Sequence, residues 1–186
     1  VPWAPQGIYS KRQLDSVADM KGLKWRAYNV GTARIGELVG AQVVTVPAAD
    51  LAQALATGVV NSFITSAATG YDSKAWESMT YFYDTQAWIP KDMTFVNKAQ
   101  FDKLDKPTQD AVLKAAATAE TRGWKMWEDK SGWYLDQLKA KGMEIVKPGP
   151  QLTADLRKVG NYMLADWQKK AGDEGKKVID AYRAMQ

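Results

Sequence analysis

The chain of 186 residues is 46% hydrophobic and 25% charged, a balance typical of a folded globular protein rather than a disordered or collagen-like chain. It contains no cysteine and no histidine, which excludes disulfides, thiol nucleophiles, imidazole acid–base chemistry and the usual zinc sites. The net charge of +4 comes from scattered basic residues, unlike the basic tract of a nucleic-acid-binding protein, and no apolar run is long enough to predict a membrane-spanning helix.

Residues 1 to about 98 alternate short strands with short helices. The pattern predicts strands at 23–29, 43–46 and 59–65, and helices at 32–39 and 48–57. Gly40 and Gly58 follow the two helices, where glycine commonly ends a helix. This rhythm predicts βαβ units and therefore a parallel sheet.

The next segment is rich in aromatic residues. Residues 71–78 are compatible with one or two helical turns. Residues 79–88 predict a long strand that crosses between two parts of the molecule, and residues 93–98 predict a second strand. Ile89-Pro90-Lys91-Asp92 separates the two predicted strands.

The last part of the chain is mostly helical. A helix of about 35 residues is predicted from Pro107 onward, in which Gly123 and Gly132 indicate a bend or a close packing contact. A short strand follows at 143–147, and then an apolar stripe typical of a helix. The stripe consists of Leu152, Leu156, Val159, Met163 and Trp167. A final helix at Asp173–Met185 is expected to bury Val178, Tyr182 and Met185.

Arg26 lies at the end of the first predicted strand, and its side chain suits a carboxylate ligand. A guanidinium stays charged and presents a planar fork of donors that matches both carboxylate oxygens. An ion pair with Asp19 or Glu37 is the structural alternative. Small polar residues at other strand ends, Asn29, Thr65 and Ser66, stand where ligands settle in open α/β sheets, or else cap turns.

An ordered set of motifs resembles the periplasmic solute-binding proteins of tripartite ATP-independent periplasmic (TRAP) transporters, in the dicarboxylate-binding-protein-like superfamily. The resemblance covers essentially the whole chain. It rests on Ser16–Lys24 leading to Arg26, on Gly40-Ala41, on Ala54–Asn61, on the aromatic crossing strand, on Val96-Asn97-Lys98, and on Trp124 and Trp127 in the long helix.

The resemblance implies an α/β fold, a type II periplasmic-binding-protein-like clamshell that binds an organic acid in the periplasm and delivers it to the TRAP membrane permease. The chain resembles the C-terminal portion of such a protein. Implied segments are a hinge or crossing segment at 1–10, the second lobe at 11–84, the crossing strand, long helix and part of the first lobe at 85–150, and C-terminal helices at 151–186 that pack back on the second lobe. Exposed apolar surface would then meet the missing N-terminal lobe or a second copy.

In the resembling family the arginine of this strand binds the ligand carboxylate, so the resemblance implies this role for Arg26. Three positions depart from the family pattern: Gln6 stands where many members have a basic residue, Ala48 where phenylalanine is common, and Thr65 where an asparagine supports the carboxylate. We therefore expect a monocarboxylate, such as an aromatic or 2-oxo or 2-hydroxy acid. The predicted ligand-binding residues are Arg26, Tyr28, Asn29, Thr65, Ser66 and Trp88.

Two other classes of function remain open at this level. A ligand-sensing module of a regulator or chemoreceptor would share the binding chemistry. An enzyme on the same framework needs an activated nucleophile or a tuned acid–base pair, and the sequence shows no paired-carboxylate constellation. The expectation is therefore a binding protein with no catalytic residues, no cofactor, no metal and no nucleic-acid partner.

Overall fold

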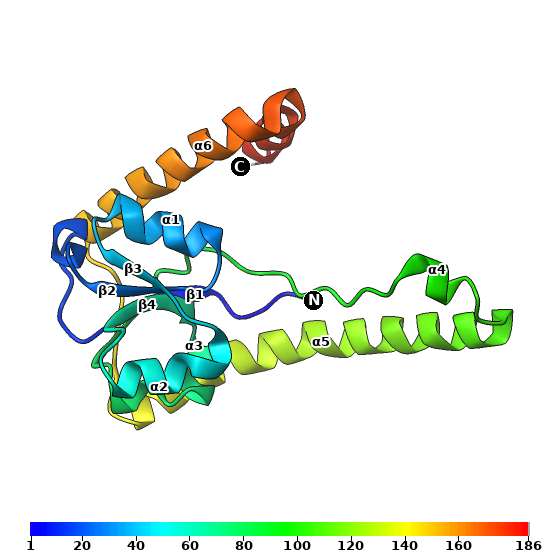
Figure 1. The fold of residues 1–186 in the computed structure, drawn as a ribbon, viewed down its shortest axis with the longest axis horizontal. Helices are drawn as coiled ribbons and strands as arrows, with labels where there is room; N and C mark the ends of the chain where they lie inside the picture. The colour runs from blue at the N-terminus through cyan, green and yellow to red at the C-terminus, as the bar shows by residue number, and fades with distance from the viewer. Residues whose placement is uncertain (186) are drawn as a thin grey trace. The chain divides into compact units, whose positions relative to one another are not determined.

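The computed structural model describes residues 1–185 (Figure 1). Its contacts divide the chain into two compact units, each built from two separate stretches. The first unit comprises Val1–Lys11 and Ile64–Lys147, and the second comprises Arg12–Phe63 and the chain from Pro148 onward.

The second unit contains a parallel arrangement of strands. β2 (Lys24–Ala27) lies between β3 (Gln42–Thr45) and the start of β4 (Ser62–Ser66), and it pairs with both in parallel. Arg26 is in register with Val44 on one side and with Phe63 on the other. The predicted parallel sheet is confirmed, and Arg26 occupies its middle strand.

Helices pack on these strands in the order that the sequence predicts. α1 (Val30–Leu38) contacts β2 and β3, and an added Cβ at its Gly36 would lie 2.6 Å from Trp25 Cδ1, so the helix approaches the strand closely. After β3 the chain forms a 3-10 turn, η2 (Ala48–Asp50), and then α2 (Leu51–Ala56). A second 3-10 turn, η1 (Val17–Met20), precedes β2.

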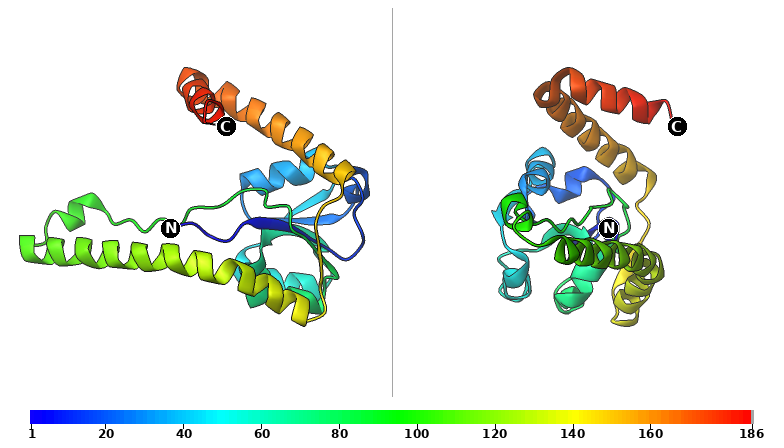
Figure 2. Two further views of the ribbon diagram at one scale, coloured as in Figure 1. Left: turned by 180° about the vertical axis from the view of Figure 1, so that it is seen from behind. Right: turned by 90° about the vertical axis from the view of Figure 1, so that its right-hand side faces the viewer.

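The C-terminal helix α6 (Pro150–Arg183) contacts α1 and η1. Gly172 interrupts it with non-helical angles (φ 59°, ψ −148°), as the predicted division into two helices requires, and the change of direction is visible in Figure 2. The predicted burial of Val178, Tyr182 and Met185 is wrong, because the residues are 59–85% exposed. The buried apolar residues of α6, Leu152 and Val159, lie near its beginning, where the helix meets its neighbours.

The first unit contains β1 (Gln6–Ser10), β5 (Tyr81–Tyr83) and β6 (Glu144–Val146). β5 pairs antiparallel with β1 and parallel with β6. β6 confirms a predicted strand, whereas the strand Gln6–Ser10 was not predicted. All five residues of β1 are buried, so the strand lacks the polar alternation that marks a half-exposed one.

Helices of the first unit are α3 (Ala67–Asp72), the 3-10 turn η3 (Ala75–Glu77), α4 (Lys98–Phe101) and α5 (Lys106–Ala140). α5 is 35 residues long and confirms the predicted long helix. An added Cβ at Gly123 would lie 2.6 Å from Val1 Cγ1, which confirms a close contact there. An added Cβ at Gly132 would have no heavy atom within 4 Å, so Gly132 makes no such close contact.

The aromatic segment differs from its prediction. β5 ends at Tyr83, because Thr85 turns back to donate its N–H to the Tyr83 carbonyl and Gln86 adopts a left-handed conformation (φ 45°). The chain then runs beside the N-terminal segment, with Gln6 and Trp3 donating to the carbonyls of Trp88 and Pro90. The predicted strand at 93–98 is wrong, since it has no neighbouring strand in the described structure.

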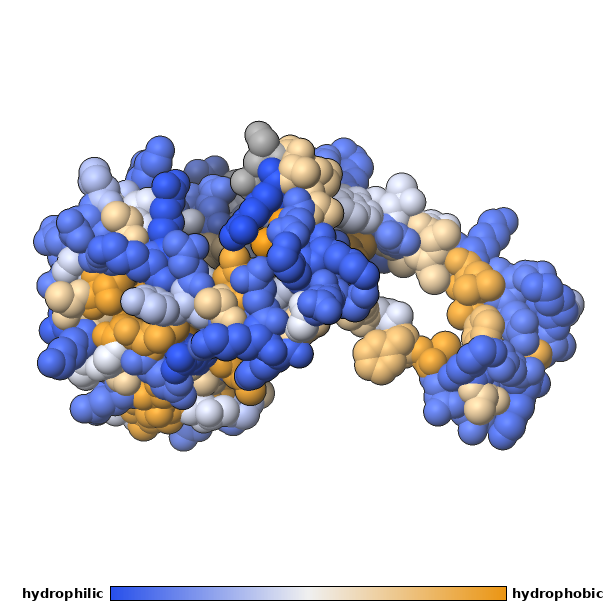
Figure 3. All heavy atoms as spheres, turned by 90° about the horizontal axis from the view of Figure 1, so that it is seen from above, coloured by the Kyte–Doolittle hydropathy of each residue, from blue (hydrophilic) through white to orange (hydrophobic). Residues whose placement is uncertain are grey.

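Apolar side chains come to the surface in the first unit (Figure 3). Phe95 and Met93 are 90% and 80% exposed, and several residues of α5 are about half exposed, among them Leu113 and Met126. Over residues 1–185, no helix is both long and apolar enough to cross a membrane.

Candidate ligand-binding site

Arg26 is the most distinctive polar residue of the second unit. Its side chain is carried by the middle strand, and the residue is only 2% exposed. The Nε group donates a hydrogen bond of 2.8 Å to the carbonyl of Val46, just beyond the end of β3. The Tyr28 ring contacts the guanidinium, with 4.9 Å between Arg26 Cζ and the ring centroid. The guanidinium therefore has one hydrogen-bond acceptor and one aromatic ring as protein neighbours.

Burial of the Arg26 guanidinium lowers its pKa from the ordinary value of an arginine, while Tyr28 acts in the opposite direction. Among residues 1–185, no carboxylate forms an ion pair with Arg26. The ion-pair alternative is wrong: Asp19 accepts hydrogen bonds from Ser16, and Glu37 pairs with Arg34 at 3.1 Å.

The terminal Nη groups of Arg26 reach the surface of the described structure. No buried side-chain nitrogen or oxygen of residues 1–185 lacks a hydrogen-bond partner, and the only bond that Arg26 donates to these residues uses Nε. The small exposed part of Arg26 must therefore include its Nη groups. A nearly buried cation with two accessible donors and no protein anion is suited to bind an anion from outside.

Tyr28 and Asn29 lie directly after β2, beside Arg26 in sequence. Asn29 is the N-cap of α1, where its side chain accepts a hydrogen bond of 2.8 Å from the Thr32 N–H. The Thr32 hydroxyl accepts in return from the backbone N–H groups of Tyr28 and Asn29. For Asn29 the structure shows the capping alternative, while Tyr28 contacts the predicted anchor directly.

Thr65, Ser66 and Trp88 belong to the first unit. Ser66 is fully buried and caps α3, accepting from the Thr69 N–H, and it also accepts from the indole Nε1 of Trp3 at 2.9 Å. Thr65 is 5% exposed. Trp88 is half buried, and its carbonyl accepts from the Gln6 N–H. The predicted residues thus form two groups, one in each unit.

Gln6 and Ala48, which depart from the family pattern, differ in their burial. Gln6 is 2% exposed, and its side-chain amide donates to the Ala4 carbonyl at 3.0 Å. A buried neutral amide at this place supplies no second cation. Ala48 begins the turn η2 and is exposed.

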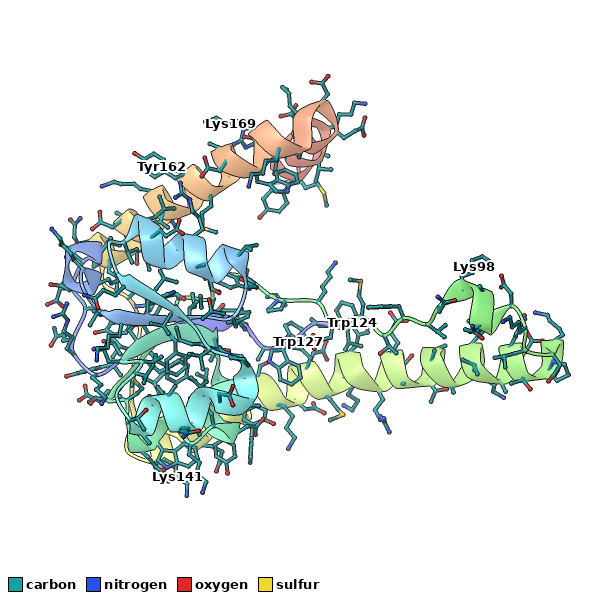
Figure 4. The ribbon with its side chains drawn as sticks, viewed as in Figure 1. Lys98, Trp124, Trp127, Lys141, Tyr162 and Lys169 are labelled. Carbon is teal, nitrogen blue, oxygen red and sulfur yellow. The ribbon has the colours of Figure 1, made fainter. Side chains whose placement is uncertain are left out.

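An apolar pocket of about 210 Å³ in the first unit was not predicted. Trp3, Met126, Trp127 and Tyr134 are among its lining residues, and the Trp127 indole donates to the Trp3 carbonyl at 3.1 Å. Figure 4 shows Trp124 and Trp127 projecting from α5. The sequence is rich in tryptophan, but no spacing rule links Trp3 to a residue so far along the chain. Residues 1–185 contain no cluster of acidic side chains arranged to hold a metal ion.

Residues 6–170 match the model of the bacterial extracellular solute-binding proteins, family 7. The chain belongs to this family. The resemblance to TRAP solute-binding proteins is thereby confirmed, as are the periplasmic-binding-protein-like α/β fold and an extracytoplasmic, periplasmic location. Members of the family are solute receptors rather than enzymes.

Solved structures of similar proteins support the assignment. DctP6 of Bordetella pertussis, an extracytoplasmic solute receptor binding pyroglutamic acid, is 54% identical, with a TM-score of 0.95 over 99% of this chain and 61% of its own. DctP7 of the same organism, also a receptor binding pyroglutamic acid, is 43% identical, with a TM-score of 0.93 over 98% of this chain and 60% of its own.

Two further relatives extend the comparison. A marine metagenome TRAP solute-binding protein specific for pyroglutamate is 38% identical, with a TM-score of 0.94 over 98% of this chain and 60% of its own. An uncharacterized protein of Haemophilus influenzae is 27% identical over 92% of this chain and 52% of its own length. The chain thus spans about half to three fifths of the length of these relatives.

Proposed function

We propose that this protein is the solute receptor of a TRAP transporter and that it binds a small monocarboxylate through Arg26. The observation that carries the proposal is the nearly buried guanidinium that has no carboxylate partner among residues 1–185 and keeps its Nη groups accessible. A carboxylate on this fork gains two charge-assisted hydrogen bonds and neutralises the buried charge.

Pyroglutamate is the ligand that the relatives favour. It is named in the structures of DctP6, DctP7 and the marine metagenome protein, which are 38–54% identical to this chain. Its single carboxylate matches a single buried arginine, and its lactam ring is a compact body with one donor and one acceptor. This narrows the expected ligand from aromatic or 2-oxo and 2-hydroxy acids to a cyclic monocarboxylate.

Further residues, the segments of the chain and its partners complete the proposed receptor. Asn29, Thr65 and Ser66 would contribute polar groups, with Trp88 packing on the ligand. Residues 1–10, 11–84, 85–150 and 151–186 would serve as the segments that the resemblance implies. The exposed apolar surface of the first unit supports a covering partner, either the N-terminal lobe of a longer chain or a second copy, and the loaded receptor would meet the TRAP permease.

Isothermal titration calorimetry of the full-length protein with L-pyroglutamate tests the proposal. The Arg26→Ala variant should lose at least about 30-fold in affinity, because it removes a desolvated charge pair worth about 2–5 kcal/mol. Arg34→Ala is the matched control, since Arg34 is exposed and pairs with Glu37 and Asp166. Equal affinity in the wild type and Arg26→Ala would overturn the anchor, and no heat with wild type would overturn the choice of ligand.

A further inference from the structure

The Arg26 fork needs two restraints to point in one direction. The hydrogen bond from Nε to the Val46 carbonyl fixes one edge of the guanidinium. Val46 is itself anchored beside β2, because its N–H donates to the Ala27 carbonyl at 3.0 Å. This bond leaves rotation of the guanidinium about the bond axis, and the Tyr28 ring lies beside the guanidinium, 4.9 Å from Cζ.

Tyr28 is held by its own neighbours. Its backbone N–H donates to the Thr32 hydroxyl at 3.0 Å, within the first turn of α1. Thr32 is fully buried, and its carbonyl accepts from the Trp25 indole at 2.8 Å, so the helix start is tied to the β2 residue that precedes Arg26. The backbone that carries the ring is therefore anchored to the first turn of α1, which suits a residue that orients another side chain.

We infer that Tyr28 is a positioning residue that acts through Arg26: its ring contacts the guanidinium and fixes the direction in which the Nη groups meet a carboxylate. The inference rests on the proposed function and adds a distinct role for Tyr28. A ring that contacts the ligand itself would contribute independently of Arg26, whereas a ring that orients the fork contributes only while the fork is present.

Calorimetry with L-pyroglutamate on the full-length protein tests this role. Tyr28→Leu should weaken binding about tenfold, within the range of a desolvated cation–π contact. Tyr28→Phe should keep the affinity to within about threefold, because it retains the ring. In the Arg26→Lys background, which has no planar fork to orient, Tyr28→Leu should change affinity by less than about threefold.

A ligand-free measurement makes the test independent of the ligand. The Nε–H resonance of Arg26, identified by its loss in Arg26→Lys, should be protected from exchange in the wild type and in Tyr28→Phe. In Tyr28→Leu it should exchange faster, because the fork is no longer held. An unchanged Nε–H signal in Tyr28→Leu would overturn the inference, as would an unchanged affinity or a tenfold loss that persists in the Arg26→Lys background.

The outcomes separate this inference from the proposed function. If Arg26→Ala binds L-pyroglutamate as tightly as the wild type, the proposed function fails. If Arg26→Ala loses binding while Tyr28→Leu does not, only the positioning role fails.

Discussion

Replacing Arg26 with methionine should weaken carboxylate binding at least about 30-fold and leave the ligand-free protein nearly as stable as the wild type. Methionine is flexible and apolar, so it fills the space of the arginine stem without a charge. The prediction follows from the setting of Arg26, which is 2% exposed and has no carboxylate partner among the described residues.

The opposing contributions can be estimated. The substitution removes the Nε–H···O bond to Val46, worth about 1.5–3 kcal/mol for a charged donor. It also removes the cation–π contact with Tyr28, worth up to about 2 kcal/mol. Against these losses stands the release of a desolvation penalty of several kcal/mol for a buried ion. We expect a net change in the free energy of unfolding of about 1 kcal/mol or less.

A structural arginine would behave differently. Removing one partner of a buried ion pair leaves the other charge uncompensated and costs about 3–5 kcal/mol. Urea unfolding followed by circular dichroism measures the difference. Without ligand, a loss above about 3 kcal/mol would refute the reasoning, because it would mean that a protein group neutralises Arg26.

The same experiment with ligand completes the test. L-Pyroglutamate at 100 times its wild-type dissociation constant should stabilise the wild type by about 2.7 kcal/mol and the Arg26→Met variant by about 0.9 kcal/mol or less. Arg34→Met is the control: it should lose less than about 1 kcal/mol, since its ion pairs are exposed, and should keep the full effect of the ligand.

Three further predictions concern stability. Gly70→Ala should destabilise the protein by about 1–3 kcal/mol, because the added methyl would overlap the hydroxyl of the buried Tyr9. Gly160→Ala has open space around the added methyl and should stabilise the protein by about 1 kcal/mol. Thermal unfolding of both variants measures the difference. Asn29→Ala should cost about 1 kcal/mol through loss of the α1 N-cap and Asn29→Asp much less, and equal losses in urea unfolding would contradict the capping role. Hydrogen bonds from the backbone and hydroxyl of Ser16 lower the pKa of Asp19. The Asp19 carboxylate therefore stabilises the fold above its unfolded pKa of about 3.8, and this stabilisation is lost as the pH falls through the lower folded pKa. The stability difference between the wild type and Asp19→Asn should be present at pH 7 and vanish in acid.

Periodicity and turn chemistry located most helices and strands because these signals are local. Glycines after the helices, β-branched runs and the proline at the start of α5 each act within a few residues. The strand Gln6–Ser10 was not predicted, because its burial depends on residues that are distant in the sequence. An added Cβ at Gly7 would overlap the Phe82 ring, so the position requires glycine, and no neighbour in sequence reveals this requirement.

In the aromatic segment, a strand was predicted where the structure has none. Residues 93–98 have strand-forming composition, but a strand forms only where another strand offers hydrogen bonds, and in the described structure none does. Asn29 and Ser66 illustrate a third case. Small polar residues at strand ends suit both ligand binding and helix capping, and the choice depends on whether a backbone N–H lies within reach. The structure supplies Thr32 N–H for the first and Thr69 N–H for the second.

The sequence by itself determined the family and the βαβ order, and it singled out Arg26 as the candidate anchor for a carboxylate. These follow from local patterns and from the fixed chemistry of a guanidinium. Tertiary structure alone decided that Arg26 is nearly buried without a carboxylate partner among residues 1–185, that the Val46 carbonyl and the Tyr28 ring contact it, and that Asp19 and Glu37 bind elsewhere. Partners of a buried charge come from strands and turns that meet only on folding, so spacing along the chain does not specify them.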